Sequence, residues 1–344
     1  MGSAAFNTEQ HPAPRRERLR ASGCRVWDGD GSAFIDIDMG GGAILLGHAH
    51  PVVEGVVADA CEGHLDAAAK ALAVLCPAAE KVRFTAEESQ ALPAAIAAAR
   101  RQTGRRRVLA CTPACGPFGD TEDLAAVVVD PLGARPADLS AARQLADGAG
   151  AVLIFDEGVS GFRVHENGAQ GLSGVTPDLA VYGAAIANGR PLGAIAGRAD
   201  LVLALSEADL PPARVQSLAA CAATLSVLAQ APVAPQLRVL GAELEAEVGE
   251  LIESSGAARF FAIDGDPTLP SPLFAAPQLE GLWLREMAAR GFIVVGPHAF
   301  SAAHGDAEIA ALIEAYAHIL PAMVAKGLLE ALLRRPPQPL AGRP

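Results

Sequence analysis

Lysine is scarce in this chain of 344 residues, and that scarcity limits the chemistry it can perform. Lysine occurs at three positions, Lys70, Lys81 and Lys326, while arginine supplies the other basic side chains apart from histidine. Aromatic residues make up 4% of the chain, and acidic residues outnumber basic ones by 39 to 27. The net charge of −12 argues against nucleic acid or an anionic membrane as a partner, because both repel an acidic surface.

Cysteine and long apolar runs are also sparse. Six cysteines in a chain of this length do not form a disulfide framework, and Cys111 and Cys115 lack a second pair at the spacing of a zinc site. No apolar run approaches a membrane span, and the first residues lack the apolar core of a signal peptide. We therefore predict a cytoplasmic protein with no metal site and no membrane partner.

The stretch at 151–198 holds the clearest pattern. The apolar run at 151–155 is typical of a buried parallel strand, and Asp156 and Glu157 follow it directly. A second short apolar run, at 179–182, leads into a glycine-rich turn. Open α/β sheets bind their ligands at the carboxyl ends of strands, so both carboxylates are candidate site residues.

The rest of the chain alternates short apolar runs with helical periodicity. A DGDG turn predicts a hairpin at 24–36, in which the aspartates act as turn formers. We predict further strands at 82–84, 108–111 and 125–130, and helices at 52–76, 91–101, 141–148, 236–255 and about 306–333.

Several motifs stand in the order and spacing of one known family. They are LGHAHP at 46–51, IFDE at 154–157, GFR at 161–163, GVTPDL at 174–179 and PLGA at 191–194. On these motifs the chain closely resembles the class III aminotransferases of PLP fold type I, and within them glutamate-1-semialdehyde 2,1-aminomutase. The resemblance implies an α/β fold, with a large domain built on a mostly parallel central sheet plus a smaller α+β domain. We accordingly predict a flexible arm at 1–20, an N-terminal hairpin segment of the small domain at 21–50, the large domain at 51–235, the C-terminal small domain at 236–333 and a tail at 334–344.

The chain departs from this family where the family holds pyridoxal phosphate (PLP). The Schiff-base lysine matches Ala184, and the phosphate-binding turn matches 87–90, which reads Glu-Glu-Ser-Gln and fits helix capping better. A ring-stacking aromatic matches Cys115, and a family glutamate after a strand matches Asp130. The aspartate that binds the ring nitrogen is kept as Asp156.

These departures predict a lysine-less homologue whose cleft binds another small molecule without a cofactor. We expect PLP-independent acid/base chemistry, an isomerisation, cyclisation or elimination in a specialised biosynthetic pathway. The candidate catalytic residues are Asp156, Glu157, His48 and Cys115, with His50 as a further histidine. The two histidines also fit a structural role near a helix start, Cys115 an inert buried thiol, and Asp156 a role in folding.

Two alternatives stay open. The chain could be a non-catalytic subunit that completes the site of an active relative through the region of Gln216 and Ser217. It could instead bind PLP or pyridoxamine phosphate (PMP) noncovalently through Asp156, Ser89 and Ser217. We predict a small-molecule ligand and a homodimer, or else a heterodimer with a related chain.

Overall fold

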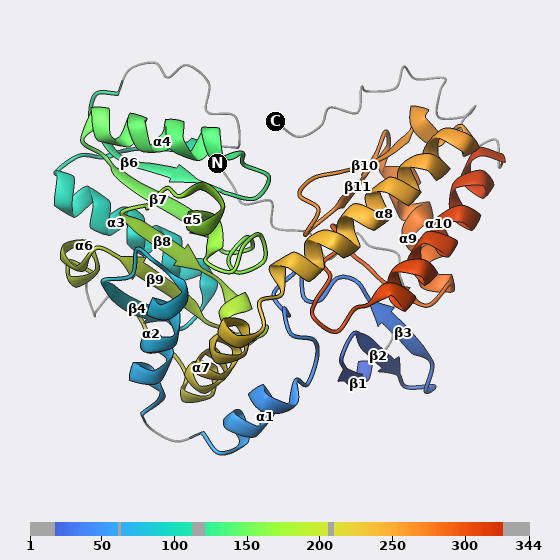
Figure 1. The fold of residues 1–344 in the computed structure, drawn as a ribbon, viewed down its shortest axis with the longest axis horizontal. Helices are drawn as coiled ribbons and strands as arrows, with labels where there is room; N and C mark the ends of the chain where they lie inside the picture. The colour runs from blue at the N-terminus through green and yellow to red at the C-terminus, as the bar shows by residue number, and fades with distance from the viewer. Residues whose placement is uncertain (1–17, 61–62, 112–120, 206–209, 326–344) are drawn as a thin grey trace.

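The computed structural model describes residues 18–60, 63–111, 121–205 and 210–325. Figure 1 shows two groups of elements, with helix α8 (Ala234–Ser255) running from one to the other. One group is a six-stranded sheet flanked by helices, and the other combines a small N-terminal sheet with the C-terminal elements.

The central sheet has the strand order β4-β9-β8-β7-β6-β5. Strands β5 to β8 are parallel, while β9 runs antiparallel to both of its neighbours. The predicted α/β class with a mostly parallel sheet is therefore confirmed, and β9 is a strand that the sequence analysis did not predict. The strands are β4 (Lys81–Thr85), β5 (Arg107–Cys111), β6 (Leu124–Val129), β7 (Val152–Glu157), β8 (Leu179–Tyr182) and β9 (Gly193–Gly197).

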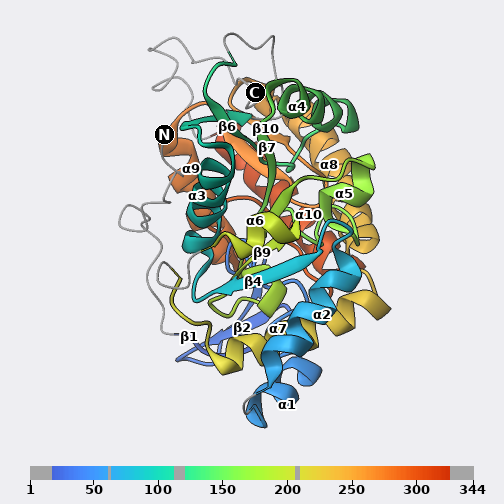
Figure 2. The ribbon, with the colours of Figure 1, turned by 90° about the vertical axis from the view of Figure 1, so that its left-hand side faces the viewer.

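Helices cover both faces of this sheet (Figures 1 and 2). One face carries α3 (Ala91–Thr103), which packs against β7, and α6 (Ala199–Leu203), which packs against α3; both share an apolar cluster with Ile154 of β7. The other face carries α2 (His64–Leu75), α4 (Pro136–Ala149), α5 (Gly168–Ser173) and α7 (Val215–Gln230). Because side chains alternate along a strand, Asp156 lies on the α3 face and Glu157 on the opposite face.

The predicted hairpin at 24–36 is confirmed as β2 (Arg25–Asp28) and β3 (Ala33–Asp36). Asp28 acts as a turn former, since its carboxylate accepts the N–H groups of Asp30 and Ser32. Strand β1 (Arg18–Ser22) pairs with β2, so the last residues of the predicted arm are part of a sheet. Strand β12 (Phe292–Ile293) joins parallel to β3, which places the hairpin in one sheet with a C-terminal strand.

The prediction of one helix over 52–76 is wrong. This segment forms two helices, α1 (Pro51–Ala58) and α2, and Gly63 directly before α2 has a φ of 105°. This left-handed conformation is open to glycine at little cost and ends the helical path. The amphipathic pattern continues across the break, which is why periodicity alone did not reveal it.

The C-terminal elements enclose a core rich in aromatic side chains, including Phe261, Trp283 and Tyr316. Besides α8 they comprise η4 (Ala257–Arg259), β10 (Phe261–Asp264), β11 (Ser271–Phe274), α9 (Pro277–Ala289) and α10 (Asp306–Ala325). Helix α10 is long and apolar enough to cross a membrane, contrary to the prediction of no such run. It packs on α8 and buries seven residues along one face, as the core helix of a globular protein does.

Arg163 of the GFR motif ties the two groups together. Its guanidinium is fully buried and donates hydrogen bonds to three backbone carbonyls, those of Gly42 (2.8 Å), Thr268 (3.0 Å) and Phe300 (3.1 Å). Burial lowers its pKa to about 10, so the side chain stays charged at neutral pH. The GFR arginine is therefore a cross-link between segments that lie far apart in sequence.

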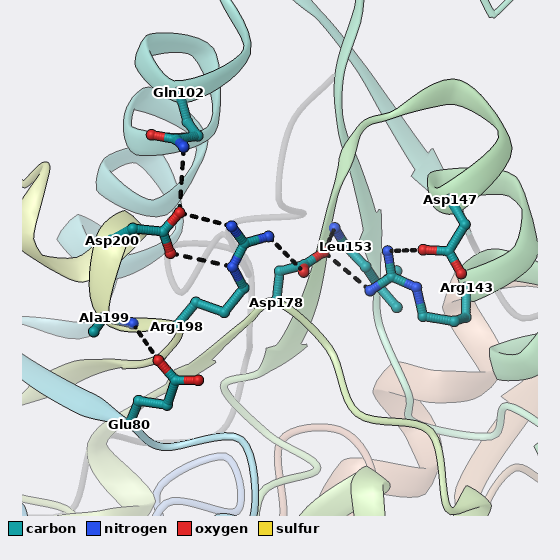
Figure 3. Close-up of polar contacts among 9 residues, drawn as sticks. All are labelled: Glu80, Gln102, Arg143, Asp147, Leu153, Asp178, Arg198, Ala199 and Asp200. Atoms are coloured by element: carbon teal, nitrogen blue, oxygen red, sulfur yellow. Dashed lines mark hydrogen bonds and ion pairs between the residues drawn. The ribbon is translucent and has the colours of Figure 1, made fainter.

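Asp178 of the GVTPDL motif organises the edge of the sheet opposite the carboxyl ends (Figure 3). One carboxylate oxygen accepts the N–H of Leu153 at 2.7 Å and Nη1 of Arg143 at 2.9 Å. The other accepts Nη1 of Arg198 at 3.2 Å. Figure 3 shows how these contacts connect β7 and α4 with the segment that begins α6.

We expect Asp178→Ala to destabilise the fold by about 2–3 kcal/mol, because the buried N–H of Leu153 loses its acceptor and two arginines each lose one of their two carboxylate partners. Urea unfolding followed by circular dichroism would measure this change. Asp147→Ala is the matched control: its carboxylate also binds Arg143 but is 65% exposed, so its loss should cost about 0.5 kcal/mol or less. Equal effects of the two variants would contradict the assigned role of Asp178.

Candidate functional site

Three acidic side chains gather at the carboxyl ends of the parallel strands. Glu88 follows β4 in the short helix η1 (Glu88–Gln90), Asp130 follows β6, and Asp156 lies in β7. Withdrawal from water raises the pKa of Glu88 and of Asp130, and the charge of Asp156 raises both further, which places the three in one electrostatic neighbourhood. We call Glu88, Asp130 and Asp156 the carboxylate site.

The carboxylate of Glu88 reaches across to the turn that follows β8. Its Oε2 accepts the N–H of Ala184, the first residue of η2 (Ala184–Ala187), at 3.2 Å. A Cβ placed on Gly183 would lie 2.4 Å from the carboxyl carbon of Glu88, so only glycine leaves room for it. A Cβ on Gly158 would lie 3.0 Å from Glu88 Oε1 and 3.4 Å from Asp156 Oδ1. The Glu88 carboxylate therefore lies between the η2 turn and Asp156.

Asp156 is half-buried and accepts the N–H of Gly158 at 3.3 Å. Partial burial raises its pKa, and the Gly158 hydrogen bond offsets this in part. The pKa of Glu88 is raised first by withdrawal from water and then by the charge of Asp156, against the hydrogen bond from Ala184. Among the described residues, no cationic side chain contributes to the pKa shift of any of these three acids. The site is thus negative and holds protons more readily than free carboxylates do.

Glu87, the residue before Glu88, has a different role. Glu87 and Gln90 form a capping box, in which Gln90 Oε1 accepts the N–H of Glu87 at 3.2 Å. The capping interpretation of 87–90 is confirmed for these two residues, and Glu88 is the one that turns towards the site. Ser89 is exposed beside it.

Comparison with known proteins identifies the family. The family model for class III aminotransferases matches residues 118–316, which is more than half of the chain. The chain belongs to the class III aminotransferase family.

Individual relatives agree with this assignment. This aminotransferase homologue is 28% identical to glutamate-1-semialdehyde 2,1-aminomutase of Syntrophobacter fumaroxidans over 86% of its own length and 88% of the relative's. It is 31% identical to the enzyme of that name in Bordetella avium over 53% of its own length, spanning 58% of that relative. A solved structure described as a transaminase with PLP bound superposes with a TM-score of 0.80, at 25% identity and 95% coverage of both chains.

Glu157 and His48, two other predicted catalytic residues of this class III homologue, form their contacts elsewhere in the fold. Glu157 is fully buried on the opposite face of the sheet, where its Oε2 accepts the N–H of Ala169 at 2.8 Å. Burial raises its pKa to about 7. Asp156 and Glu157, predicted as an acidic pair, therefore do not face one cleft.

His48 forms an ion pair with buried Asp36, at 2.8 Å from Nε2 to Oδ2, and His50 directly precedes α1. This geometry favours the structural alternative for both histidines. Ser217 is buried in the first turn of α7, and Cys115 lies outside the described residues. Within the described ranges, no three metal-binding side chains converge closely enough to hold an ion.

Sequence reasoning did not select Glu88 or Asp130 as site residues of this family member. Glu88 was assigned to capping together with its neighbour, because both acids stand at a helix start. The signal that could have found it is the glycine at position 183, which leaves room for an incoming side chain next to Ala184. For Asp130 the signal is its place after an apolar run, which Asp156 shares. Because the carboxyl ends of parallel strands lie at one edge of a sheet, the two acids could have been expected in one site.

Proposed function

We propose that this class III aminotransferase homologue works without PLP, and that its cleft binds another small molecule and transfers protons through carboxyl groups. The observation that carries the proposal is the position of the Glu88 carboxylate, on the N–H of Ala184 and beside Asp156. By resemblance, Ala184 stands at the lysine position and Asp156 at the aspartate that meets the cofactor ring. The Glu88 carboxylate lies between these two positions, so a cofactor held by both would have to share that space with a carboxylate.

The charges support the same conclusion. PLP carries a phosphate dianion, and the matching turn carries two acidic residues, of which Glu88 turns towards the site. Among the described residues, no cation perturbs the acids of the carboxylate site, so nothing there offsets the repulsion. Alanine at position 184 offers no amine for an imine. The residues present do not fit PLP, and they fit a neutral or cationic ligand better.

Glu88 and Asp156 are the carboxyl groups that would move protons. Burial raises the pKa of both groups, and the charge of Asp156 raises that of Glu88 further, so the pair holds a proton more readily than two separate carboxyl groups do. We assign ionised Asp156 as the group that would accept a proton from the substrate, and protonated Glu88 as the group that would donate one to another atom. This exchange leaves the substrate with the same number of protons, as an isomerisation requires. We propose this role for Glu88 in place of Glu157.

Retention of Asp156 supports a second candidate, noncovalent binding of PLP or PMP through the ring nitrogen. Ser89, exposed next to Glu88, is the hydroxyl that could then reach the phosphate. The pseudoenzyme alternative would use exposed Gln216 at the start of α7 to complete the site of a related chain. Assembly as a homodimer, or as such a heterodimer, and a cytoplasmic location remain part of the proposal.

The deciding measurement is an absorption titration of the purified protein with PLP and with PMP. We expect no saturable binding to the wild type or to Ala184→Lys, because the Glu88 carboxylate occupies the space beside residue 184. The double variant Ala184→Lys/Glu88→Gly should gain a saturable visible band, since it removes the carboxylate and supplies the amine. Saturable micromolar binding to the wild type that disappears in Asp156→Asn would overturn the proposal and establish the noncovalent alternative.

A further inference from the structure

A second cavity lies along β4, the edge strand of the central sheet. It has a volume of about 720 Å³ and is enclosed by α2, β4, the segment 210–213 and the start of α7. Figure 2 shows α2 beside β4 on the face towards the viewer, and the two elements are in contact. None of the residues that line it belongs to the carboxylate site. We call it the lysine cavity, for the reason given next.

Lys70 of α2 and Lys81 of β4 both line this cavity, and they are two of the three lysines in the whole chain. Asp66 stands one helical turn before Lys70, yet neither lysine forms an ion pair with another described residue. Glu80, the other acid in the lining, accepts the N–H of Ala199 at 2.9 Å. The cavity therefore presents two ammonium groups without partners among the described residues, with Arg83 as a third cationic residue in its lining, in a chain of net charge −12.

The cavity floor is apolar. Phe84, Leu210 and Leu218 are buried and line it together with half-buried Val82. Its volume lies in the range of sites that take small organic ligands, roughly 300–1,000 Å³. Lysine ammonium groups at the edge of an apolar cavity match a ligand with a charged end and an apolar body.

We propose that the lysine cavity binds a small amphipathic carboxylate. The carboxylate group lies between the ammonium groups of Lys70 and Lys81, and the apolar body packs on Phe84, Leu210 and Leu218. Each ammonium is a point charge with three donors, which suits a carboxylate oxygen in any orientation. This site is independent of the proposed function, because it shares no residue with the carboxylate site.

Octanoate is the probe that tests the proposal, by isothermal titration calorimetry on the full chain. We expect saturable binding that weakens at least about tenfold in Lys70→Gln/Lys81→Gln, since both charges are lost. Arg106→Gln is the matched control, because Arg106 is 90% exposed beside β5 at the opposite edge of the sheet. It should leave octanoate binding unchanged, and octanol should bind the wild type at least about tenfold more weakly than octanoate does.

A second variant tests the apolar half of the site. Ala69→Trp fills the cavity from α2 while both lysines remain, so it should abolish octanoate binding, and a cooperative thermal unfolding transition would show that the variant still folds. Absence of octanoate binding to the wild type, or equal binding by the lysine double variant, would overturn the proposal. So would a wild-type dimer that falls apart in the lysine double variant without binding octanoate, because the cavity would then be a surface for self-association.

Discussion

Arg163→Ala is expected to destabilise the protein by about 3–5 kcal/mol. The three carbonyl groups of Gly42, Thr268 and Phe300 would remain in a buried space without their donor. An orphaned buried acceptor costs about 1–3 kcal/mol, and the missing side chain also leaves a void. Urea unfolding monitored by circular dichroism would show a lower midpoint.

Two further variants separate charge from geometry at this position. Arg163→Lys keeps the positive charge but not the planar fork, so it should recover less than half of the loss. Arg106→Ala removes an arginine that is 90% exposed and should change stability by about 0.5 kcal/mol or less. Full recovery by lysine would show that charge alone matters and would contradict the role assigned to the three carbonyl contacts.

Glu157 should make the protein less stable as the pH rises from about 4.5 to about 7. Its pKa is about 7 in the folded chain against an ordinary value of 4.5, so the folded state holds a proton that the unfolded state has already released. A group with a raised pKa contributes its full stability below the unfolded value and loses it as pH rises through the folded value. The loss amounts to about 3 kcal/mol at 1.36 kcal/mol per unit of pKa.

Glu157→Gln should abolish this part of the pH dependence, because an amide does not titrate. Unfolding free energies at about pH 5 and about pH 8 would differ less in the variant than in the wild type, by about 2.5 kcal/mol, because pH 5 already lies above the unfolded pKa. Glu250→Gln, on the exposed surface of α8, is the control and should leave the difference unchanged. An unchanged difference in Glu157→Gln would mean that this carboxyl group ionises normally inside the fold.

The sequence alone was sufficient to predict most of the strands that carry the site. The runs at 151–155, 179–182 and 125–129 are continuous and apolar, as strands buried on both faces must be. The sequence analysis missed strand β9 because Gly193 and Gly197 give it little strand propensity. Its hydrogen bonds to β4 on one side and β8 on the other stabilise it instead. The break before α2 depends on the backbone angle of a single glycine.

The site itself was only half predictable. Its place at a strand end identifies Asp156 as a site residue. Successive side chains of a strand point to opposite faces of the sheet, and the sequence analysis did not use this rule to separate Glu157 from Asp156. The position of Glu88 depends on the tertiary approach of η1 to the turn after β8, and no local pattern encodes such an approach. His48 was a candidate acid/base residue in the sequence because nothing near it in the chain indicated a partner. Its partner Asp36 lies twelve residues away, at the end of β3.

The pairing of β12 with β3 sets a condition on how this chain can fold during its synthesis. The hairpin leaves the ribosome long before its parallel neighbour Phe292–Ile293, because most of the described chain lies between them. Until then, one edge of β3 lacks its native partner and is open to pairing with other chains. We therefore infer that nascent chains stalled before residue 292 carry this exposed edge and depend on chaperones more than the finished protein does.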